Sequence, residues 1–193
     1  VCAARGVHEQ GLPLTISTRI PRLGVASHVE ATRRELLRLG AKVFVLDPAY
    51  LAMLGDDSGE PNLFKIGSIL REFGEVAEET GATMVLLHHF RKAVRSNAAF
   101  TRPTLEEFSF SGFGEWARQW VLLKRRNAFR QGSGVHELYC EVAGSVGQSS
   151  AWALTIDEGQ ARDVLAEGRQ WDVIAEPYDE LEHEAQSKTS SRG

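Results

Sequence analysis

Residues 42–48 read KVFVLDP and residues 83–92 read TMVLLHHFRK, and these two stretches decide the fold class. Each is a continuous apolar run that stops at polar residues, at Asp47 in the first and at His88 in the second. Such runs are typical of strands buried on both faces, which are parallel strands covered by helices. Between them, residues 66–77 place apolar side chains at helical spacing. The strand–helix–strand order predicts an α/β domain with a right-handed crossover.

Further elements are expected on both sides of this unit. Ser27 and Glu30 have the capping-box form, so a helix is predicted from there to Leu39, with Gly40 as its left-handed stop. Residues 120–123, which read WVLL, predict a third buried strand.

The rest of the chain divides into an edge hairpin, a helix and a tail. Residues 136–142 and 150–156 favour two antiparallel strands at the edge of the sheet, which completes a core over residues 1–160. A carboxyl-terminal helix is expected over residues 161–175. Residues 176–193 have few large apolar side chains, so we expect a disordered acidic and polar tail.

Length and composition describe an ordinary globular chain. It has 193 residues, 42% hydrophobic and 25% charged, with a net charge of −4. This charge argues against binding to nucleic acid or membranes through the overall field, but it allows a local basic patch. No apolar run approaches the length of a membrane span, and two cysteines fit a reducing cytoplasm. The chain begins with Val1 rather than Met, so we expect it to be cut from something longer.

Three predicted strands each end in a polar cluster. In an open parallel sheet the carboxyl ends of the strands share one edge, and ligands bind there. A carboxylate, an imidazole and several cations at one edge suit a phosphate group with a divalent metal. The residues are Asp47 after the first strand, His88, His89 and Lys92 after the second, and Lys124 and Arg126 after the third.

Each cluster also has a purely structural interpretation. Asp47 before Pro48 is commonly a turn. The adjacent His88 and His89 point to opposite sides of a strand, so one of them is expected to be structural. A Lys-Arg-Arg run is usually a solvated strand end. Only the conjunction of the three clusters favours a functional site.

A family resemblance adds to this interpretation. The segments VFVLDP, ETGA, MVLLHHFRK and FSGFGEWARQWVLLKRRN resemble the RepA-like and DnaB-like hexameric helicases, which are RecA-like P-loop ATPases of the AAA family. The resemblance spans residues 14–157. It implies a three-layer RecA-like domain with a mostly parallel central sheet, and a homo-oligomeric ring, a hexamer in this family. It also implies ATP and Mg²⁺ as cofactors, single-stranded DNA as a partner, and no membrane.

The resemblance assigns roles around a nucleotide. Asp47 matches the Walker B aspartate that holds Mg²⁺ through water, and His89 matches the sensor of the terminal phosphate. Lys92 belongs to the same motif as His89. Lys124 and Arg126 match the Lys-x-Arg pair that such rings insert into the neighbouring subunit's site.

Other basic residues have further roles by the same resemblance. Arg118 matches an arginine before the final strand and is assigned to cofactor binding. The segment 91–110 falls where these proteins carry a loop that faces the central channel. There Arg91, Arg95 and Arg102 are predicted to contact nucleic acid, beside Asn97 and Phe100.

One departure from the family is severe. The phosphate-binding motif of the family contains Gly-Lys, and this dipeptide occurs nowhere in the chain. The catalytic glutamate is not identifiable either. One interpretation is the carboxyl-terminal part of a longer ATPase, which alone would bind nucleotide poorly. Another is a catalytically inactive regulatory or assembly module of the same fold. A third is an unrelated α/β binding domain whose strand-end polar groups are incidental.

Overall fold

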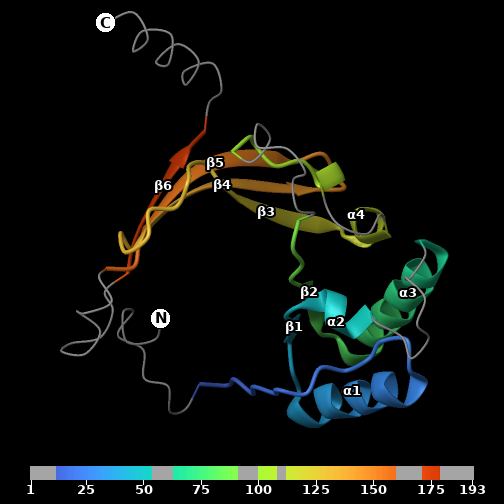
Figure 1. Cartoon of the computed structure of the whole chain (residues 1–193). Helices are drawn as coiled ribbons and strands as arrows, with labels where there is room; N and C mark the ends of the chain where they lie inside the picture. The colour runs from blue at the N-terminus through green and yellow to red at the C-terminus, as the bar shows by residue number, and fades with distance from the viewer. Residues whose placement is uncertain (1–11, 54–62, 91–99, 108–111, 160–170, 179–193) are drawn as a thin grey trace, which may run out of the picture. The chain divides into compact units, whose positions relative to one another are not determined.

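The chain forms two compact units, which are drawn in Figure 1. The structure is a computed structural model that describes residues 12–53, 63–90, 100–107, 112–159 and 171–178. We call residues 15–92 with 105–117 the helical unit. We call residues 1–14, 93–104 and 118–193 the sheet unit. Each unit is described by itself.

The helical unit contains the predicted strand–helix–strand order. Its two strands, β1 and β2, pair in parallel, from Val43 opposite Thr83 to Leu46 opposite Leu86. The prediction of a mixed α/β chain with parallel pairing of these two stretches is therefore confirmed. The elements are α1 (Ala26–Leu39), β1 (Val43–Leu46), α2 (Ala49–Met53), α3 (Leu63–Thr80), β2 (Thr83–Leu86), the 3-10 helix η3 (Leu105–Glu107) and α4 (Gly112–Trp116).

Helix α1 ends as predicted but begins differently. Gly40 adopts φ 59°, the left-handed conformation expected of a helix stop. The capping box is wrong, because the cap is Val25, which has no side-chain acceptor, and Ser27 lies inside the helix. Near this end, Nδ1 of His28 accepts a hydrogen bond from the backbone N–H of Arg22 at 3.1 Å.

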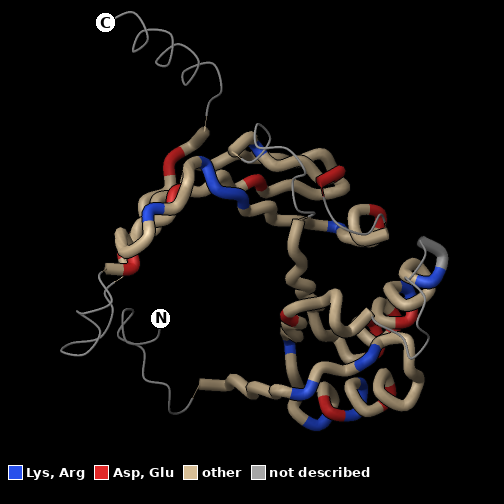
Figure 2. Tube along the Cα trace, in the orientation of Figure 1, with Lys and Arg blue, Asp and Glu red and all other residues tan. Residues whose placement is uncertain are grey.

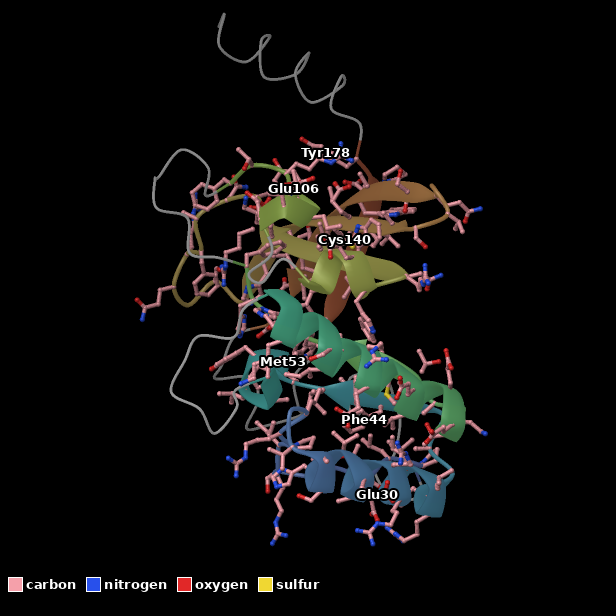
Figure 3. All side chains as sticks on the ribbon, turned by 90° about the vertical axis from the view of Figure 1, so that its right-hand side faces the viewer. Glu30, Phe44, Met53, Glu106, Cys140 and Tyr178 are labelled. Atoms are coloured by element: carbon pink, nitrogen blue, oxygen red, sulfur yellow. The ribbon has the colours of Figure 1, made fainter. Side chains whose placement is uncertain are left out.

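An apolar core fixes the helices of this unit on one face of β1 and β2. Phe73 of α3 is 1% exposed, and its ring meets Phe44 of β1 edge to face at 5.9 Å. Figure 3 labels Phe44 and Met53 among these side chains. The predicted apolar face of the central helix is confirmed for its buried members, Ile66, Ile69, Leu70, Phe73 and Val76.

The opposite face of β1 and β2 is exposed in this structure. Val43 and Val45 are 57% and 55% exposed, and Val85 and Leu87 are 39% and 41% exposed. The expectation that both faces of these strands are buried is therefore not met by the described residues. Apolar runs predict two covered faces, but a strand pair can bury only the face against which other elements pack.

The sheet unit is a four-stranded antiparallel sheet in the order β3-β4-β5-β6. The antiparallel pairing of the predicted hairpin is confirmed, with Gly147 at φ 81° in its turn, but its strands β4 and β5 are the inner strands of this sheet and do not lie at an edge. The prediction of a third parallel, doubly buried strand is wrong, because β3 pairs antiparallel with β4. Its burial alternates, with Leu122 3% exposed and Val121 58% exposed. The strands are β3 (Gln119–Arg125), β4 (Val135–Gly144), β5 (Ser149–Asp157) and β6 (Asp172–Pro177).

Strand β6 corrects the expected carboxyl-terminal organisation. It pairs with β5 from Asp172 opposite Asp157 to Pro177 opposite Trp152. The end of the helix expected over residues 161–175 and the start of the tail expected over residues 176–193 are therefore strand. The remainder of both predictions lies outside the described residues. The β-branched residues Val173 and Ile174 favour a strand, and the edge of β5 is available for pairing.

Candidate functional site

The carboxyl ends of β1 and β2 lie side by side in the helical unit. The backbone N–H of Leu87 donates to the carbonyl of Leu46 at 3.0 Å, and that of Ala49 donates to the carbonyl of Leu87 at 2.8 Å. These two hydrogen bonds join the segments that follow β1 and β2, next to Asp47 and His88. The predicted common edge is therefore present for the first two strand ends.

The two histidines at this edge differ in their surroundings. The ring of His88 is half-buried and lies edge to face against Phe113 of α4, with 5.0 Å between ring centres. Burial lowers the pKa of His88 below its ordinary value of 6.5, and this effect exceeds the hydrogen bond from its Nδ1 side to the carbonyl of His89, which acts in the opposite direction. His89 itself is exposed. His88 thus packs inward, as one of the pair was expected to do, and His89 is accessible to a ligand.

Asp47 offers a single accessible carboxylate. It is exposed, and it follows the last residue of β1 directly. Mg²⁺ bound to a nucleotide takes most of its ligands from phosphate oxygens and water and needs only one or two protein carboxylates. Among the described residues no group of three or more His, Cys, Asp or Glu side chains is arranged to hold a metal ion. The donor set at Asp47 therefore fits a cation carried by a phosphate ligand.

Tyr50 is a neighbour of this edge that the sequence analysis did not identify. It lies in the first turn of α2, and its ring centre is 6.4 Å from those of both His88 and His89. Its position three residues after Asp47 on a helix that begins at the strand exit was the available signal.

Lys124 and Arg126 belong to the sheet unit, so the argument from one shared parallel sheet does not hold for them. Lys124 is the penultimate residue of β3, and Arg126 follows the last one, Arg125, with its backbone N–H donating to the carbonyl of Glu137 at 2.9 Å. Nζ of Lys124 is 3.2 Å from Oγ1 of Thr101. The guanidinium of Arg126 lies 3.8 Å from a carboxylate oxygen of Glu137, and the side chain of Arg126 is 17% exposed.

Arg102 and Arg118 have different surroundings in the same unit. The guanidinium of Arg102 forms a two-pronged ion pair with the carboxylate of Glu141, which is 13% exposed. A nucleic-acid contact by Arg102 would have to compete with this pair. Arg118 is exposed, and its carbonyl accepts a hydrogen bond from the N–H of Ser145 at 3.0 Å.

The remaining predicted residues, Arg91, Lys92 and Arg95, lie outside the described residues. Their roles stay predictions.

Comparison with known proteins supports part of the family resemblance. The sequence profile of a family described as an AAA domain matches residues 3–95, which include Asp47, His88 and His89. This match supports a relationship to the AAA-type P-loop ATPases and indicates a nucleotide-binding, ATPase-type function. It ends before Lys124. No curated protein and no solved structure matches the chain.

None of the described helices combines the length and the apolar composition that a membrane crossing requires.

Proposed function

We propose that this chain is part of an ATP-dependent nucleic-acid motor of the replicative-helicase type. In this proposal it assembles as a homo-oligomeric ring, a hexamer, with a RecA-like core in each copy and ATP hydrolysed between neighbouring copies. The observation that carries the proposal is the common edge with Asp47 and His89, both exposed, inside the segment that matches an AAA domain. Parallel α/β sheets bind their ligands at this edge.

Each residue at the edge has a distinct task in this mechanism. The carboxylate of Asp47 would hold Mg²⁺ through water and would so help to position the phosphates of the nucleotide. His89 donates a hydrogen bond to a γ-phosphate oxygen. Mg²⁺, when bound, neutralises charge on the phosphates. The half-buried His88 packs on Phe113 and holds the strand exit in place.

Lys124 and Arg126 are proposed to complete the site of a neighbouring copy. They lie two residues apart at the end of β3, and in this proposal that spacing lets both cations approach the same phosphate group. The transferred phosphoryl group gains charge in the transition state, so a cation positioned there stabilises it more than the ground state.

ATP hydrolysis by the product of the complete reading frame tests the proposal. Asp47→Asn should lower kcat at least about 100-fold, because the carboxylate that orients the metal-bound water is lost. Glu75→Gln on the exposed surface of α3 is the matched control and should keep full activity. Equal rates for wild type and Asp47→Asn would remove Asp47 from the site and overturn the proposal.

Mixing two inactive variants tests the site between copies. Arg126→Ala should lower kcat by about 1,000-fold, the effect expected of an arginine finger. A mixture of Asp47→Asn and Arg126→Ala subunits should regain part of the activity, because some interfaces then combine an intact edge with an intact finger. A mixture that stays as inactive as its components would contradict action between copies.

The absence of Gly-Lys in the chain favours a second function, a non-hydrolysing regulatory or assembly module. The two functions differ in a binding and turnover experiment. A module of this kind would bind Mg²⁺–ATP or a partner copy with unchanged affinity in Asp47→Asn and would show no turnover in any variant.

A further inference from the structure

The segment that contains β3 and its connection to β4 is the most basic stretch of the described chain. Residues 116–136 contain five Lys and Arg side chains and no Asp or Glu, in a protein whose net charge is −4. Figure 2 shows the run of positive residues that ends β3. The turn is closed by a hydrogen bond from the N–H of Ser133 to the carbonyl of Arg130 at 3.1 Å. A local field of this kind attracts phosphate groups even when the whole chain is acidic.

A stack of side chains positions Arg125 in this connection. Its guanidinium carbon lies 4.8 Å from the ring centre of Phe129. Phe129 in turn stacks on His136 of β4, with 5.1 Å between ring centres and 6° between the planes. Nε2 of His136 lies 3.3 Å from a carboxylate oxygen of Glu158, which follows β5. The stack therefore connects the loop to the start of β4 and the end of β5.

The cations of this connection fall into two groups. Lys124 and Arg126 direct their polar atoms at Thr101, Thr155 and Glu137 of the protein. Arg125 and Arg130 are exposed, and among the described residues neither guanidinium forms an ion pair or a hydrogen bond. A cation–π contact orients a guanidinium without using its N–H donors. Arg125 is thus held in place with its donors available to an anion.

We propose that the β3–β4 connection binds the backbone of single-stranded nucleic acid. Arg125 and Arg130 contact its phosphates, and the ring edge of Phe129, a residue that is 45% exposed, contacts an adjacent base. A single strand is the occupant that fits, because its bases are accessible to an aromatic side chain beside the phosphate contacts, whereas those of a duplex are stacked inside. The inference deepens the proposed nucleic-acid motor and rests on it for the choice of polymer.

This surface differs from the nucleic-acid contact expected from the sequence. That expectation included Arg102, whose guanidinium is paired with Glu141 in the structure. The sequence pattern singles out only the Lys-x-Arg pair in this run of cations, and it does not distinguish Arg125 and Arg130. The available signal was the aromatic Phe129 between them in an acid-free segment.

Fluorescence anisotropy of a labelled oligothymidylate measures the binding directly. The full chain is titrated without nucleotide at several salt concentrations. The double variant Arg125→Ala, Arg130→Ala should raise Kd by roughly tenfold and should lower the slope of log affinity against log salt by about 1.4, since each lost phosphate contact removes about 0.7. Phe129→Ala should raise Kd by roughly fivefold, because Arg125 is no longer positioned and the contact between the ring edge and a base is lost.

Two controls separate this surface from general charge and from damage to the fold. Arg34→Ala with Arg71→Ala removes two arginines that are 73% and 79% exposed on α1 and α3, and this variant should keep the wild-type Kd and slope. Arg125→Lys keeps the charge but loses the planar stack, and should bind between wild type and Arg125→Ala. Protection of β4 amides from hydrogen exchange in every variant reports whether the sheet is intact.

Several results would overturn the inference. They are absence of oligothymidylate binding by wild type, an unchanged Kd and slope in the Arg125–Arg130 double variant, an equal loss in the Arg34–Arg71 control, or tighter binding of a duplex of the same length. Because the titration contains no ATP, a failure of ATP hydrolysis to depend on Asp47 would overturn the proposed motor and leave the binding result standing. If ATP hydrolysis depends on Asp47 but the Arg125–Arg130 double variant binds oligothymidylate as wild type does, the proposed motor stands and the binding surface is refuted.

Discussion

The helical unit and the sheet unit differ in where their apolar side chains lie. Seventeen apolar residues are buried in the described part of the chain, and fourteen of them belong to the helical unit. The sheet unit contributes three, which are Leu122, Cys140 and Ala153. Figure 3 labels Cys140 among the side chains of that unit. The two units therefore have different sources of stability.

In the helical unit, burial of side chains is the main source of stability. In the sheet unit, the backbone ladders of four strands, a two-pronged ion pair and a stack of aromatic and charged side chains take a larger share. Each hydrogen bond or exposed ion pair contributes less than a fully buried aromatic side chain. We therefore expect core substitutions to dominate in one unit, and changes of backbone geometry in the other.

The largest effect is expected from Phe73→Ala in α3. The side chain is 1% exposed and touches Phe44, so its removal leaves a cavity and should destabilise the helical unit by about 3–5 kcal/mol. Hydrogen exchange of α1, α3 and β2 amides during urea titration measures the loss. Arg71→Ala on the same helix should change stability by less than about 0.5 kcal/mol. Equal effects of the two substitutions would contradict a core centred on Phe73.

Gly134→Ala should have the largest effect on the sheet unit. Gly134 has φ 69°, and an added Cβ would lie 2.2 Å from the carbonyl oxygen of Gly159. The strained backbone and the clash together should cost about 2–3 kcal/mol. Gly132→Ala is the matched control, since it has φ 80° but meets nothing within 4 Å, and should cost only about 1 kcal/mol. Exchange of β4 and β5 amides is the measurement, and similar values for both variants would show that the close approach is unimportant.

A smaller effect is expected for the ion pair of Arg102 and Glu141. The carboxylate is 13% exposed and the guanidinium 38% exposed, so solvent screens the pair in part. A double-mutant cycle with Arg102→Ala and Glu141→Ala should give a coupling free energy of about 1 kcal/mol. The same cycle in 1 M salt should give less, because screening is stronger there. Additive single effects at low salt would show that the pair does not contribute.

The smallest effect is a pH dependence from His88. Its pKa is lowered in the folded chain by burial, so below its ordinary value of 6.5 the unfolded chain binds the proton first. Stability of the helical unit should therefore be complete above about pH 6.5 and fall as the pH drops toward the lowered pKa. His88→Gln should flatten this decline, measured by urea unfolding from pH 7.5 to pH 5, and His89→Gln is the neighbouring control. If stability still declines with falling pH in His88→Gln, the pH dependence arises from other titratable groups.

Local patterns were sufficient for most secondary structure. Continuous apolar runs predicted β1 and β2, helical spacing predicted the buried face of α3, and Gly40 marked a helix end. The capping box failed because Ser27 fits a cap by sequence, while the helix is capped two residues earlier, at Val25. The residues of β6 were read as helix and tail because a strand with both faces exposed carries no burial pattern.

The candidate site was predictable only in part. The strand order predicted that Asp47 and His88 lie at the same edge of the sheet, because they follow two parallel strands whose carboxyl ends meet there. The inward packing of His88 on Phe113 was beyond sequence reasoning, because Phe113 is 25 residues away along the chain. The assignment of Lys124 and Arg126 to the same sheet failed because an apolar run does not specify the direction of its partner.

The sequence by itself determined the elements and the chemistry at their ends: two apolar strands, an amphipathic helix, an acid after one strand and imidazoles after the other. These properties depend on neighbouring residues and on periodicity, which a linear pattern contains. The tertiary structure alone decided that β3 joins an antiparallel sheet, that one face of β1 and β2 is exposed, and that Phe129 holds Arg125 in place. These features arise from contacts between distant residues, whose free energies depend on packing that no local pattern records.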